Sequence, residues 1–196
     1  RLAASTMPFS SMQRDINNFI DPTVYEKAAD PNKPKLGRLF ERILNEFKAS
    51  YPGFSKDLPV KRTFWAEKRT AYEGSSFNAF NAFRTYKIKE SNVDKAIELL
   101  NDGGLAMPPK KIGNMDLDWH QYDKLIVAMN KSPDELADAE LMEKYGANNM
   151  RQSMSKLVDG PVWKMLKDDP EGQKMQLIEV RNDFVQAGKA YMAMTD

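Results

Sequence analysis

The chain has 196 residues, of which 41% are hydrophobic and 29% charged, and its 29 basic and 28 acidic side chains leave a formal net charge of +1. This near balance predicts neither a broad nucleic-acid-binding surface nor a strongly acidic one. The lack of cysteine excludes disulfides, thiolate metal sites and cysteine nucleophiles. No apolar run approaches the roughly 18 residues that a membrane helix needs, so we expect no membrane span.

The charge is distributed unevenly along the chain. Residues 33–69 carry ten Lys or Arg against four Asp or Glu, whereas residues 114–146 carry eight acidic residues against three Lys. Opposite blocks of this kind can pair between copies or neighbours, or form two separately solvated faces, and the second interpretation is favoured. The first residue is Arg and no signal segment follows, so we expect the chain to begin inside a longer protein.

Two helices are predicted in residues 1–50. Ser10 to Gln13 form a capping-box pattern, which predicts a short helix to about Ile20, ended by Asp21-Pro22. The clearest helix runs from Leu36 to about Ser50. Its apolar residues recur with helical spacing and form a wide stripe: Leu36, Leu39, Phe40, Ile43, Leu44 and Phe47.

Residues 51–90 have no helical period but contain nine aromatic residues between Tyr51 and Tyr86. Aromatic side chains are enriched at interfaces, and long loops are uncommon inside compact domains. The segment either packs on this chain's own helices or forms an arm on another chain, and the second interpretation is favoured. A short hairpin pairing Arg62–Ala66 with Lys68–Tyr72 is one further option.

The remaining residues predict several more helices. Asp118 and Gln121 form a capping box, and Ser132-Pro133 repeats the start signal. In the last helix Leu177, Phe184 and Tyr191 recur every seven residues, and Gly188 allows close approach by a neighbour, so a heptad seam competes with an ordinary buried helix. The expected helices cover about 92–101, 119–130, 133–145, 148–158 and 171–194.

These patterns predict a mainly α fold with several amphipathic helices, a long irregular aromatic-rich arm and at most one small hairpin. The expected division is an N-terminal helical segment (1–50), the extended aromatic arm (51–90) and a C-terminal helical region (91–196).

Motifs for catalysis or cofactor binding are not evident. His120 is the only histidine and lies in the first turn of a predicted helix, which favours a structural or surface role over a catalytic one. The sequence contains no phosphate-binding glycine motif, and Asp116, Asp118 and Asp123 lack calcium-loop spacing. We expect no cofactor, no metal and no enzymatic activity. The open alternative is a peptidoglycan-cleaving module that uses an acidic residue.

The basic and aromatic residues at 56–72 would suit single-stranded nucleic acid, through stacking and phosphate contacts, as well as they suit a protein interface. A contact with DNA is therefore kept only as a secondary expectation.

A series of short motifs follows a characteristic order along the chain. The opening residues Pro8–Ile16 lead to Ile20-Asp21-Pro22-Thr23 after a short helix. The later motifs are Tyr51–Ser55, Leu58-Pro59, Phe77–Asn81, Glu98-Leu99, Pro108–Ile112, Leu117 to Tyr122-Asp123, and Ile178 to Phe184. In this order the motifs resemble the C-terminal end of very large bacteriophage proteins, namely tail tape-measure proteins and internal virion proteins ejected with the genome. The chain departs from the pattern at Ala79 and Ala82, where proline is usual.

The resemblance implies a structural virion component that assembles in several copies and assists genome delivery across the host envelope. Its implied partners are copies of itself and portal, tail or ejection proteins, and its implied location is the virion, with delivery into the host envelope on infection. A host-directed interaction domain is a further alternative. The residues expected at interfaces are Phe64, Trp65, Tyr72, Phe77, Phe80, Phe83, Phe184 and Tyr191.

Overall fold

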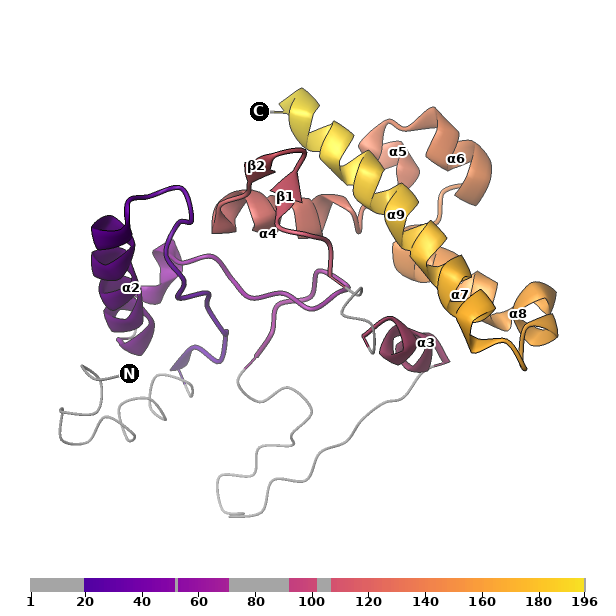
Figure 1. Ribbon diagram of the computed structural model, residues 1–196, viewed down its shortest axis with the longest axis horizontal. Helices are drawn as coiled ribbons and strands as arrows, with labels where there is room; N and C mark the ends of the chain where they lie inside the picture. Colours follow the sequence, from indigo (N-terminus) through magenta and orange to yellow (C-terminus); the bar gives the residue numbers. More distant parts are fainter. Residues whose placement is uncertain (1–19, 52, 71–91, 102–106, 196) are drawn as a thin grey trace, which may run out of the picture. The chain divides into compact units, whose positions relative to one another are not determined.

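The computed structural model describes residues 20–51, 53–70, 92–101 and 107–195 (Figure 1). The described part is mainly α-helical with one small antiparallel hairpin, which confirms the predicted fold class. The elements are α2 (Lys35–Ser50), the short 3-10 helix η1 (Ser55–Asp57), α3 (Asn92–Asn101), β1 (Lys111–Ile112), β2 (Met115–Asp116), α4 (Trp119–Ala128), α5 (Pro133–Leu136), α6 (Ala139–Tyr145), α7 (Met150–Asp159), α8 (Pro161–Met165) and α9 (Pro170–Thr195).

The chain forms two compact units, which interleave along the sequence. Unit 1 takes the described residues of Arg1–Thr63, Glu67–Ile88 and Lys110–Asp123, and unit 2 takes those of Phe64–Ala66, Lys89–Pro109 and Lys124–Asp196. These bounds do not follow the linear division expected from composition, because residues 110–123 belong with the N-terminal part and residues 64–66 with the C-terminal part.

Unit 1 is held together largely by extended segments rather than by helix packing. Antiparallel bridges join Tyr25 to Val60 and Arg62 to Lys68, and the backbone amide of Lys61 donates to the carbonyl of Val24 at 2.8 Å. The Arg62–Lys68 bridge lies inside the region where the sequence suggested a hairpin. The regular two-strand hairpin, however, is formed by β1 and β2.

The β1–β2 hairpin pairs Lys111 with Asp116 and Ile112 with Met115. Its turn contains Gly113 with a φ of 59°, a left-handed conformation that favours glycine. Immediately after β2, Asp118 and Gln121 cap α4 reciprocally: the amide of Gln121 donates to Asp118 at 2.8 Å, and the amide of Asp118 donates to Gln121 at 3.0 Å. The predicted capping box is therefore confirmed.

Unit 2 is built around α9, the long yellow helix of Figure 1, which packs with α3, α5, α6 and α7. Phe184, Leu177, Met150, Met154 and Met129 are fully buried in this unit. Two of the three repeating positions of α9, Leu177 and Phe184, therefore face the chain's own core, which agrees with the interpretation of α9 as an ordinary buried helix.

Gly188 allows a close approach inside unit 2. A Cβ atom on this residue would lie 3.0 Å from the backbone nitrogen of Met129 and 3.2 Å from its Cα. The backbone that packs closely against Gly188 is thus that of Met129 in the same unit.

The predicted acidic helix over residues 133–145 is two helices, α5 and α6. Ala137 adopts a left-handed conformation with a φ of 54°, and the Asp138 side chain then accepts a hydrogen bond from the amide of Leu141 at 2.9 Å. Asp138 therefore caps the start of a new helix. Aspartate favours such a capping position over the interior of a continuous helix.

The expected helix at 10–20 lies outside the described residues apart from Ile20, as does most of the arm beyond residue 70. Over the part of the chain that the structure describes, none of the helices has the length and apolarity needed to cross a membrane.

Candidate interaction surface

Helix α2 is attached to unit 1 through its polar side. The Glu41 carboxylate accepts a hydrogen bond from the Asp30 amide at 3.1 Å and pairs with the Lys33 ammonium at 2.8 Å. The Asn45 side-chain amide donates to the carbonyl of Ala28 at 3.3 Å. These contacts place residues 28–33 against the polar face of the helix.

The apolar stripe of α2 is consequently left open. No residue of this helix is buried, and the exposed fractions of its large apolar side chains range from 47% for Phe47 to 72% for Leu36. Monomeric soluble proteins rarely leave a contiguous apolar surface of this kind uncovered. We call this set the α2 stripe; it consists of Leu36, Leu39, Phe40, Ile43, Leu44 and Phe47.

The spacing within the α2 stripe suits packing against another helix. Leu36, Phe40, Ile43 and Phe47 follow one another at intervals of four, three and four residues. This is the spacing of the core positions in a helical bundle, where side chains of one helix insert between those of another. The stripe is wider than that seam, because Leu39 and Leu44 lie beside it.

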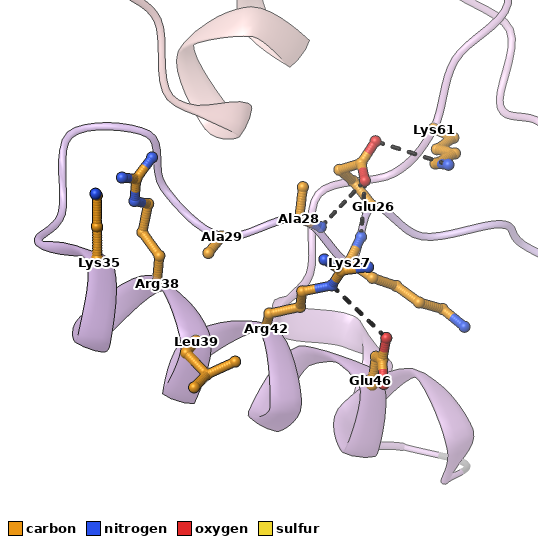
Figure 2. Close-up of a pocket in the computed structure, with 10 residues that line it drawn as sticks. All are labelled: Glu26, Lys27, Ala28, Ala29, Lys35, Arg38, Leu39, Arg42, Glu46 and Lys61. Carbon is orange, nitrogen blue, oxygen red and sulfur yellow. Dashed lines mark hydrogen bonds and ion pairs between the residues drawn. The ribbon is translucent and has the colours of Figure 1, made fainter. Parts of the chain in front are cut away.

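A basic groove adjoins the α2 stripe. The groove has a volume of about 750 Å³ and lies between α2 and the extended segment that contains residues 26–29 (Figure 2). Five cationic and two anionic side chains line it, an excess of three positive charges. The lining residues with charge are Lys27, Lys35, Arg38, Arg42 and Lys61, with Glu26 and Glu46.

Two of these cations are already paired. The Lys61 ammonium lies 3.7 Å from a carboxylate oxygen of Glu26, and the Arg42 Nε lies 3.8 Å from a carboxylate oxygen of Glu46 (Figure 2). The Glu26 carboxylate also accepts hydrogen bonds from the backbone amides of Lys27 and Ala28, at 2.9 and 3.1 Å, within its own segment. The pairs leave the other three cations as the source of the excess charge.

Lys110 does not line the groove but lies close enough to Glu26 and Lys61, which do, to be affected by their charges. Its ammonium lies 3.2 Å from the centre of the Trp119 ring and 5.3 Å from that of Tyr122, a cation–π arrangement. Burial lowers the pKa of Lys110, and the nearby Lys61 acts in the same direction while Glu26 opposes it. Burial also raises the pKa of Tyr122 to about 12.

The residues that the sequence placed at interfaces separate into three groups. Phe64 and Phe184 are buried in unit 2, which corrects the expectation that they lie at an interface. These side chains contribute to the chain's own core and offer no surface to a partner. Trp65 and Tyr191 are partly exposed; Trp65 lies beside Phe64 and Arg151, and Tyr191 contacts Lys131. Tyr72, Phe77, Phe80 and Phe83 lie outside the described residues.

His120 lines a smaller hollow of about 280 Å³ in unit 1, together with Asp30, Glu41, Asp57 and Asp118. All four of these acids already have backbone or side-chain partners. Glu41 and Asp118 are paired as described above, Asp30 accepts a hydrogen bond from the Asn32 amide at 2.9 Å, and the Asp57 carboxylate lies 3.7 Å from the Lys48 ammonium. Among the described residues, no group of three or more His, Asp or Glu side chains is placed to hold a metal ion.

No protein-family model, no curated protein and no solved structure matches the chain. The candidate interaction surface is therefore identified from the structure of α2 alone. The spacing of the stripe was visible in the sequence, but its exposure was not, because periodicity identifies an apolar face without saying whether anything covers it.

Proposed function

We propose that this chain is a structural component of a bacteriophage virion, the C-terminal part of a tape-measure-like or internal ejection protein that assembles in several copies and assists genome delivery. The observation that carries the assembly is the exposed α2 stripe. The order of short motifs from Pro8 to Phe184 is what suggests the virion context.

In this proposal the α2 stripe of one copy packs against the α2 stripe of another copy. The four-three-four spacing of Leu36, Phe40, Ile43 and Phe47 is self-complementary, because an identical helix supplies the matching knobs and holes. The polar contacts of Glu41 and Asn45 lie on another side of α2 and need not break when copies associate.

Burial of the α2 stripe would supply the driving force. Removing a large apolar side chain from water contributes about 1.5–3 kcal/mol when burial is complete, and six such side chains are available on α2. Association costs about 4–15 kcal/mol in lost freedom, so an assembly requires most of the stripe to take part.

The virion role has a direct test in particles of a phage that encodes the chain. Mass spectrometry of purified particles should detect peptides from this segment, and their amount per particle should correspond to several copies. After ejection is triggered with host envelope, the same peptides should leave the particle. Peptides found only in the infected cell and never in the particle would contradict the virion role.

A further inference from the structure

The basic groove beside α2 is a second candidate surface, which shares Leu39 with the α2 stripe. Lys27, Lys35 and Arg38 line it, and within the described residues their side chains form no ion pair or hydrogen bond. Elsewhere in unit 1, Arg62 is paired with Asp123 at 2.6 Å. The groove therefore contains three cations without an acidic partner among the described residues.

The helix itself adds to the positive potential at one end of the groove. Lys35 is the first residue of α2, and its N-cap, Pro34, provides no side-chain acceptor. The first turn also contains no acidic residue. The partial positive charge of a helix N-terminus therefore adds to the charges of Lys35 and Arg38, which extend side by side from the first turns of α2 (Figure 2).

The shape and lining of the groove restrict the anion. Lys35, Arg38 and Arg42 are spaced along one side of α2, so the charge is extended along the helix rather than focused on one point. No aromatic side chain lines the groove, which leaves no platform for base stacking. The arrangement suits successive phosphates on a polymer backbone.

We infer that the groove between α2 and residues 26–29 binds the sugar–phosphate backbone of duplex nucleic acid without reading its sequence. Lys35 and Arg38 contact phosphates from the helix, and Lys27 does so from the facing segment. The inference is independent of the virion role, because it requires only the geometry of unit 1.

Counterion release makes the inference quantitative. A protein that neutralises three phosphates of duplex DNA should have a slope of log K against log salt concentration of about −2.7, or an affinity loss of about 40-fold between 50 and 200 mM salt. The double variant Lys35→Gln/Arg38→Gln removes two contacts and should leave a slope of about −0.9. Lys164→Gln, on the exposed surface of α8, is the matched control and should leave the slope unchanged.

The experiment is a fluorescence anisotropy titration of the full chain with two labelled DNA duplexes of different sequence and with a single strand, at several salt concentrations. Equal affinity for the two duplexes, together with the reduced slope of the double variant, is the expected result. Circular dichroism of the double variant should match that of the parent chain, because neither side chain holds the fold.

Four outcomes would overturn the inference. Undetectable binding to the duplexes would mean that the cations serve another partner, such as an acidic protein. An unchanged slope in the double variant would place the contacts elsewhere. Displacement of the duplex by inorganic phosphate at equal ionic strength would assign the groove to a free phosphate. Much tighter binding of the single strand would assign recognition to base stacking outside the groove.

Discussion

The carboxylate of Glu41 accepts a hydrogen bond from the backbone amide of Asp30 at 3.1 Å, and through this contact α2 is anchored by its charged side. The usual arrangement of an amphipathic helix is the reverse, with the apolar stripe against the core and the charges in water. The Glu41–Asp30 contact therefore determines what α2 presents to other molecules.

Substitution of Glu41 should loosen α2 without unfolding the rest of unit 1. Glu41→Ala removes the acceptor for the Asp30 amide and the partner of Lys33, and should cost about 1–2 kcal/mol of local stability. Hydrogen exchange should report it as faster exchange at the Asp30 amide and along α2. Glu46→Ala, which removes only the longer pair with Arg42, is the control and should change exchange little.

Two glycine substitutions compare a tightly packed position in unit 2 with an open position on α2. Gly188→Ala should destabilise the protein by about 1–3 kcal/mol, because its Cβ would press on the backbone of Met129 at 3.0 Å. Gly37→Ala should instead stabilise it by about 0.5–1 kcal/mol, because the nearest atoms lie 3.9 Å away and alanine favours helix. Urea unfolding measures both, and equal effects would contradict the described packing.

The core of unit 2 should depend strongly on Phe184. This side chain is fully buried, so Phe184→Ala should lower the free energy of unfolding by about 3–5 kcal/mol through lost burial and the cavity left behind. Met165→Ala, at a residue of α8 that is 82% exposed, should change it by less than about 0.5 kcal/mol. A small effect at Phe184 would mean that this residue is not in the core.

Acid should weaken unit 1 through Asp21. Burial acts to raise the pKa of this carboxyl, but hydrogen bonds from Tyr25, Thr23 and Ser55 outweigh it and hold the pKa below its usual value of 3.8. A lowered pKa in the folded state gives stability that is present above pH 3.8 and is lost as the pH falls through the folded value.

Chemical denaturation between pH 6 and pH 2 should show this loss in the parent chain. Asp21→Asn should remove the corresponding part of the pH dependence, and Tyr25→Phe should reduce it, because the Tyr25 hydroxyl donates to Asp21 at 2.6 Å. An unchanged pH profile in Asp21→Asn would show that Asp21 does not contribute.

The helices could be predicted from sequence where local signals decide them. The expected bounds of α3 match the structure, and α2 begins one residue earlier than expected, because capping residues and apolar periodicity act within a few turns. The break between α5 and α6 was missed, since the left-handed Ala137 and the capping role of Asp138 have no strong local signature.

The interaction surfaces could be predicted only in part. The stripe and the basic surplus of residues 33–69 are evident in the sequence, but the fold decides which face of α2 is used for attachment. The hydrogen bonds from Asp30 to Glu41 and from Asn45 to Ala28 join residues more than ten positions apart. The groove likewise requires Lys61 and Lys27 to lie opposite α2, which no local pattern specifies.

Whether the α2 stripe joins copies of this chain can be measured by light scattering over a concentration series. The parent chain should form a defined oligomer, and Phe40→Glu/Ile43→Glu should be monomeric with unchanged circular dichroism, because both side chains are exposed within a single copy. Met165→Glu, on α8, should keep the oligomer. A parent chain that stays monomeric at every concentration, or a double variant that remains oligomeric, would contradict the claim.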